Sequence, residues 1–147
     1  MKRLLLLLAL TAVLAVPVVA APKKKPAATP AVEKAAPDFT GRYETAGEKK
    51  TVFILHVRQT GNDAEVEFSA SNADGSGAAP DGNGSGALNE KGELAFTFED
   101  STGNKGTGLL KKTGATFQLT IKAEPVVDAR AAKLYGVVVL KRGVDRE

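Results

Sequence analysis

The stretch that decides the fold runs from Thr51 to Ala70 and reads TVFILHVRQTGNDAEVEFSA. Apolar and polar side chains alternate in both halves, on either side of Gly61-Asn62, a pair that tolerates positive φ. A two-residue turn there pairs Gln59 with Ala64. The same register sets apolar residues opposite each other on one face and charged or polar residues on the other: Val57 and Val66, Leu55 and Phe68, Arg58 and Glu65, His56 and Glu67. Because both faces agree in one register, the sequence predicts an antiparallel hairpin.

The same alternation continues along the chain after residue 38. Eight runs read as strands: 39–45, 51–59, 64–71, 84–89, 93–99, 105–111, 115–122 and 134–141. Most connections are short, but residues 73–83 form a Gly-rich loop and Asp128 to Lys133 read as a short helical turn before the last strand. Consecutive short strands joined by tight turns predict an all-β, eight-stranded antiparallel up-and-down barrel over 38–147, with an open β-sandwich as the alternative.

The N-terminal region has the pattern of an export signal. A basic start is followed by an apolar run over 4–16 and by the small residues Val18-Val19-Ala20. We therefore expect a signal peptide over 1–20, cleaved between Ala20 and Ala21, and a periplasmic or secreted mature protein without a membrane span. Residues 21–37, APKKKPAATPAVEKAAP, predict a disordered linker.

Composition excludes several classes of function. The 147-residue chain has no cysteine and one histidine, so a disulfide framework, a thiolate zinc site and a multi-histidine metal site within one chain are ruled out. Residues 38–147 hold 14 basic and 16 acidic side chains, a net charge of −2. Without a basic stripe carrying interleaved aromatic residues, nucleic-acid binding is not expected. We expect a monomer.

Residues 38–43, DFTGRY, begin the first predicted strand and resemble the start of lipocalins and fatty-acid-binding proteins, the calycin group. In that group a Gly-x-Trp plugs the closed end of the barrel, and a basic residue of the last strand packs over the aromatic ring. The resemblance implies that Lys141 or Arg142 lies across Tyr43 by a cation–π contact. It also implies an eight-stranded barrel with an apolar interior that carries small lipophilic ligands.

A noncatalytic exported binding module is the leading functional expectation. A small lipophilic ligand would contact inward aromatic side chains, for which the candidates are Phe53, Phe68, Phe96, Phe98 and Phe117. The alternative is an inhibitor or interaction module that binds an envelope protein or glycan through the 73–83 loop. A third hypothesis, a hydrolase using Glu99 and Asp100, requires both carboxylates in a concave pocket. His56 is expected on the outer face, without a partner nucleophile.

Two near-repeats, 72–77 and 81–86, follow the form [D/N]-x-[D/N]-Gly-Ser-Gly. Oxygen ligands at alternate positions followed by glycine resemble a calcium loop. The candidate ligands are Asp74, Asp81, Asn83 and Ser85. The same residues are also favoured in turns for their backbone chemistry alone, so a flexible hairpin loop is the alternative. No other cofactor is expected.

Overall fold

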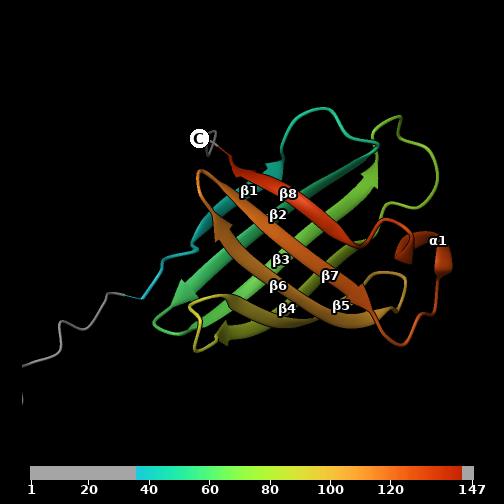
Figure 1. The fold of residues 1–147 in the computed structure, drawn as a ribbon. Coiled ribbons are helices and arrows are strands. Elements are labelled where there is room, and N and C mark those ends of the chain that lie inside the picture. The colour runs from blue at the N-terminus through green and yellow to red at the C-terminus, as the bar shows by residue number, and fades with distance from the viewer. Residues whose placement is uncertain (1–35, 144–147) are drawn as a thin grey trace, which may run out of the picture. The chain divides into compact units, whose positions relative to one another are not determined.

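The computed structural model describes residues 36–143, which form eight strands and one short helix (Figure 1). The elements are β1 (Gly41–Thr45), β2 (Thr51–Thr60), β3 (Asp63–Asn72), β4 (Asp81–Leu88), β5 (Leu94–Asp100), β6 (Lys105–Thr113), β7 (Thr116–Ala123), α1 (Ala129–Ala132) and β8 (Val137–Arg142). The predicted signal peptide and residues 21–35 of the predicted linker lie outside the described residues. Within 36–143, no helix is long and apolar enough to cross a membrane.

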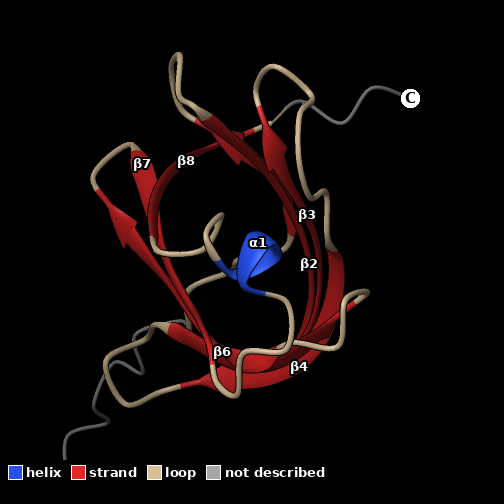
Figure 2. Cartoon of the chain, turned by 90° about the vertical axis from the view of Figure 1, so that its right-hand side faces the viewer, coloured by secondary structure: helices blue, strands red, loops and turns tan. Residues whose placement is uncertain are grey.

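The strands form one closed antiparallel barrel in chain order. Each strand pairs with the next, and β8 returns to pair with β1, as the ring in Figure 2 shows. The barrel predicted from the alternating pattern is therefore confirmed, and the chain does not form the open sandwich. Closure leaves every strand with a neighbour on both sides, which removes exposed sheet edges.

The hairpin formed by β2 and β3 has the predicted register. Gln59 pairs with Ala64, and Leu55 pairs with Phe68. Leu55 is fully buried, whereas His56, the next residue, is exposed on the outer face as expected. One face of each strand therefore supplies the barrel core and the other supplies its outer surface.

Aromatic rings fill the barrel at two levels. Toward α1, Phe53 stacks on Phe68 with ring centroids 5.2 Å apart, and Phe98 and Tyr135 meet Phe68 edge to face. At the other level, the ring of Phe117 lies 4.7 Å from that of Tyr43. Between and around the rings, the core is completed by buried aliphatic side chains, among them Leu55, Val66, Leu94, Leu110, Leu119, Ile121 and Leu140.

One end of the barrel is closed by residues that precede β1. Phe39 is only 1% exposed, and its carbonyl accepts a 2.6 Å hydrogen bond from the Tyr43 hydroxyl. The guanidinium of Arg142 lies 5.5 Å from the centre of the Tyr43 ring and donates a hydrogen bond to its hydroxyl. Of the two basic residues expected to cover Tyr43, Arg142 makes the cation–π contact; Lys141 instead forms an ion pair with Glu44.

The other end is covered by α1 and the turns around it (Figure 2). The helical turn was predicted at this place, and Asp128 caps it by accepting a hydrogen bond from the Arg130 amide. The side chain of Asn104 binds the loop before α1 through the amides of Val127 and Asp128. Ala131 of α1 is fully buried.

Two strand starts differ from the prediction by three residues, and the other strand limits by at most two. β4 begins at Asp81 rather than residue 84, so the connection predicted as 73–83 ends at residue 80. Glycine at position 82 suggested a loop, but Gly82 faces inward under Phe68, whose ring leaves no room for a side chain there. β8 begins at Val137 rather than residue 134, because the helical turn continues through hydrogen bonds from the amides of Leu134 and Tyr135.

Candidate functional site

The five phenylalanines predicted to contact a lipophilic ligand all lie inside the barrel. Phe53 is fully buried, and the other four, Phe68, Phe96, Phe98 and Phe117, are at most 7% exposed. Four of the five pack against other aromatic rings, and the Phe96 ring covers Gly108. The interior therefore has the expected apolar character, but aromatic side chains occupy it.

The four predicted calcium ligands fall on two different elements. Asp74 lies in the connection between β3 and β4, where its carboxylate accepts hydrogen bonds from the Ser76 hydroxyl and amide, which lower the pKa of Asp74. Asp81, Asn83 and Ser85 lie along β4, so the expected loop does not extend over 81–83, and a calcium loop over 81–86 does not form. Among residues 36–143, no three His, Asp or Glu side chains meet in an arrangement that could hold a metal ion.

The outer face of β4 instead forms the floor of a long hollow. Asp81, Asn83 and Ser85 alternate with inward glycines and are all exposed. Long side chains rise beside them from neighbouring strands, since Asn83 pairs with Glu67 on β3 and with Glu99 on β5. Ser85 lies between a long side chain, Glu65 on β3, and a short one, Thr97 on β5. The long walls are therefore highest around Asn83, and the neighbours of Asp81 are short. We call this surface the β4 trough: the floor at Asp81, Asn83 and Ser85, with walls from β3, β5 and β6 and outer parts from β1, β2 and the end of β7.

Three open hollows, of about 820, 610 and 660 Å³, follow one another along this surface. The first and second share Asn83 and Glu99, and the second and third share Ser85, so the trough is continuous. Their charged linings comprise seven carboxylates (Asp63, Glu65, Glu67, Asp81, Glu99, Asp100, Glu124) and three cationic side chains (Arg42, Arg58, Lys105). Counted over Asp, Glu, Lys and Arg alone, the lining carries a net charge of −4, or −3 without Asp100, which is buried.

Ion pairs hold part of the walls in place. Arg58 lies 3.2 Å from the carboxylate of Glu67, and Lys105 lies 3.1 Å from that of Glu99. Both carboxylate side chains remain more than half exposed, at 54% and 57%. In the described part of the chain, the Asp81 carboxylate on the floor forms no ion pair. The trough therefore offers accessible acceptors to a ligand.

The inward glycines explain why β4 lies deep in the surface. A Cβ atom at Gly84 would meet the backbone oxygen of Thr97 at 1.9 Å, and one at Gly82 would meet the Phe68 ring at 2.3 Å. Without side chains on that face, β4 can approach both the core and the neighbouring strand. Along the near-repeat at 81–86, two roles therefore alternate. The glycines allow close packing on the inner face, and the polar residues line the trough on the outer face.

Asp100 has a different environment from the one a hydrolase would need. The carboxylate is 5% exposed and accepts hydrogen bonds from Thr102, Asn104 and the Tyr135 hydroxyl. Burial by itself would raise the pKa of Asp100. The hydrogen bonds together lower it by more, so the net pKa lies below the ordinary value. Burial and the bond to Asp100 raise the pKa of Tyr135. Asp100 is therefore a charged acceptor that organises the α1 end.

Comparison with protein-family models, with curated proteins and with solved structures gives no match to this chain. The resemblance of residues 38–43 to the calycin group consequently stays a prediction, and the arrangement of this chain's own residues carries the functional argument.

Proposed function

We propose that this protein is an exported, noncatalytic binding module that recognises a polar macromolecule of the envelope or its surroundings on the β4 trough. The observation that carries the proposal is the contrast between the two faces of the sheet. The inner face is packed with aromatic rings and covered at both ends, whereas the outer face of β4 is open, polar and hollowed.

The packed interior favours surface binding over transport of a lipophilic molecule. Phe68 packs against both Phe53 and Phe98 at the level where a ligand would enter below α1. Protein interiors are packed as densely as organic crystals, so a ligand would have to displace these rings. At the opposite end, Phe39 and Tyr43 occupy the corresponding space.

The exposure and the ion pairing of the trough carboxylates favour binding over catalysis. A general acid must keep its proton at working pH, which requires burial or a neighbouring negative charge. Glu67 and Glu99 are instead more than half exposed, and each is paired with a cation. Both carboxylate oxygens of Asp100 already accept hydrogen bonds from residues of the barrel.

Affinity capture tests the proposal. The purified protein would be immobilised and exposed to an envelope extract, beside the variant Asn83→Lys, which raises a long cation from the trough floor. The matched control is Gln118→Lys on the outer face of β7, which lines none of the trough hollows. We expect the wild type and the control to retain the same component and Asn83→Lys to lose it.

A second measurement addresses the interior. We expect no saturable uptake of a hydrophobic dye or a fluorescent fatty acid by the wild-type protein. Saturable uptake at one site per molecule would refute surface binding in favour of a carrier. Equal retention by Asn83→Lys and Gln118→Lys would remove the trough as the binding surface.

A further inference from the structure

The spacing of the floor residues matches an extended chain. Asp81, Asn83 and Ser85 are successive outward residues of one strand, so their Cα atoms repeat about every 6.7 Å. A peptide in extended conformation repeats its side chains on one face with the same period. A polypeptide segment laid along β4 would therefore place every second side chain above a floor residue or between two of them.

The backbone of β4 takes no part in such recognition. Its register residues pair with β3 on one side and with β5 on the other, within a closed barrel. A partner therefore cannot join the sheet as an added strand, which is the usual way for an extended peptide to bind an open edge. Side chains of the floor and walls must supply the contacts.

The net charge of the trough lining indicates the charge that a partner should carry. Without the buried Asp100, the lining has six carboxylates and three cations, a net charge of −3, and the cations Arg58 and Lys105 are already paired with wall carboxylates. Asp81 on the floor lies on the strand between Ser69 of β3 and the turn residue Ser101, so its short neighbours leave it accessible. Complementary potentials favour a cationic segment and oppose an anionic one.

We infer that the β4 trough binds an extended basic segment of a partner protein, with Lys or Arg at every second residue facing Asp81 and the carboxylates of Glu67 and Glu99. This inference rests on the proposed function, because it names the occupant of the same surface. The two-residue period of β4 determines the spacing of the basic residues in the partner. The negative charge of the wall carboxylates is the reason why these residues are basic.

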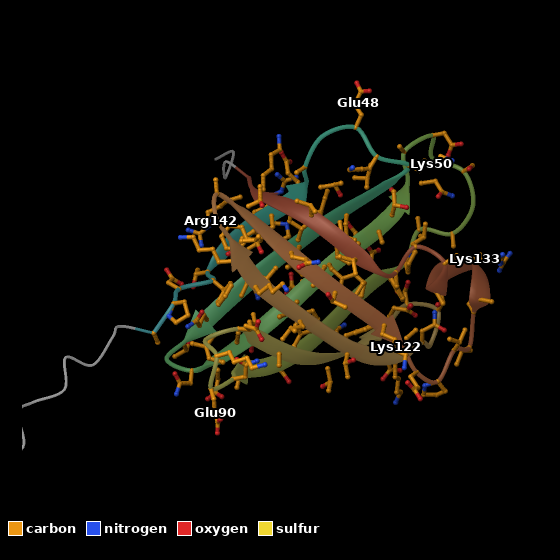
Figure 3. The ribbon with its side chains drawn as sticks, in the orientation of Figure 1. Glu48, Lys50, Glu90, Lys122, Lys133 and Arg142 are labelled. Atoms are coloured by element: carbon orange, nitrogen blue, oxygen red, sulfur yellow. The ribbon has the colours of Figure 1, made fainter. Side chains whose placement is uncertain are left out.

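Three blocked synthetic peptides test the occupant: SKSKSKS, its acidic counterpart SESESES, and KSSKSSK, which has the same charge but spaces successive lysines three residues apart, on opposite faces of an extended chain. Binding would be measured by calorimetry with the wild-type protein and with Asp81→Asn, Glu67→Gln and Glu99→Gln. The control Glu48→Gln removes the same charge from the connection between β1 and β2, where Glu48 points away from the barrel (Figure 3) and lines none of the trough hollows.

We expect SKSKSKS to bind more tightly than KSSKSSK, and SESESES not to bind. Each trough variant should weaken the dissociation constant about threefold, as expected for an exposed charge pair, and Glu48→Gln should leave it unchanged. Raising the salt from 50 to 500 mM should weaken binding about tenfold or more, because exposed charges are then screened.

Equal weakening by Glu48→Gln, equal binding of the acidic peptide, or binding of a neutral oligosaccharide in place of SKSKSKS would overturn the inference. Its failure can be separated from that of the proposed function. If no peptide binds while Asn83→Lys still abolishes capture from the extract, the trough is the site and the basic segment is wrong. If Asn83→Lys leaves capture unchanged, the trough itself is wrong.

Discussion

Replacing Gly84 with alanine is the most direct test of how β4 is placed. The added Cβ atom would lie 1.9 Å from the backbone oxygen of Thr97, and Cβ atoms in proteins essentially never approach a heavy atom closer than 3.0 Å. The two strands would have to separate by about 1 Å or more. Neither atom is the end of a flexible side chain, and β4 and β5 pair along their whole length. We therefore expect a cost at the upper end of overpacking, about 3 kcal/mol.

The matched control is Gly114→Ala. Gly114 has φ of 63° in the turn between β6 and β7, and an added Cβ atom would meet nothing within 4 Å. This variant should lose only the strain of a left-handed conformation, about 1 kcal/mol. The comparison separates close approach of the strands from the ordinary need for glycine in a turn.

Thermal unfolding followed by tyrosine fluorescence measures both variants, since the chain contains two tyrosines and no tryptophan. For a domain of about 100 residues, 3 kcal/mol lowers the melting temperature by roughly 12–24 °C. If Gly84→Ala costs no more than Gly114→Ala, the strands are not held in contact at this point. The explanation of why β4 lies low in the surface would then be wrong.

Three further predictions concern the two ends of the barrel. Asp100→Asn should lower the free energy of unfolding by about 2–3 kcal/mol, because an amide nitrogen would replace one acceptor oxygen in a buried network. Urea titration measures this loss, and an unchanged midpoint would contradict the role assigned to Asp100. The pKa of Asp100 is lower in the folded protein, so its contribution is fully present above about pH 4 and is lost as the pH falls through the folded value; melting temperatures from pH 7 to pH 2 should fall more steeply in the wild type than in Asp100→Asn. Arg142→Met should cost about 1 kcal/mol through the lost contact with Tyr43, whereas Lys141→Met should leave stability unchanged, and thermal melts that rank the two in the reverse order would exclude the cation–π contact.

The alternating strands could be predicted because their inward residues are large. In the β2–β3 hairpin, each inward position carries a recognisable apolar side chain, so both the period and the register are visible. β4 has glycine at inward positions 82, 84 and 86, which hides the period and imitates a loop. The available signal was the regular alternation of glycine with Asp81, Asn83 and Ser85, which a flexible loop does not require.

Long-range pairings determined what the sequence left open. Lys141 and Arg142 are adjacent in the chain, and only the pairing of Tyr43 with Arg142 across the β1–β8 boundary decides which of them reaches the ring. The role of Asp100 similarly depends on Tyr135, 35 residues away, whose hydroxyl reaches its carboxylate. The trough escaped prediction for the same reason, because its walls come from strands on both sides of β4.

The pairing of β1 with β8 also constrains how the chain can fold. It joins Tyr43 to Arg142, 99 positions apart, and the register there spans only three residue pairs. Seven of the eight ladders link neighbours in sequence and can form while a nascent chain is still growing, but the ring cannot close before residue 142 has emerged. Until then both outer strands have unpaired backbone groups, which leaves the sheet open to wrong partners. Formation of this one short ladder therefore removes the last two free strand edges and, with them, the sites at which another chain could add.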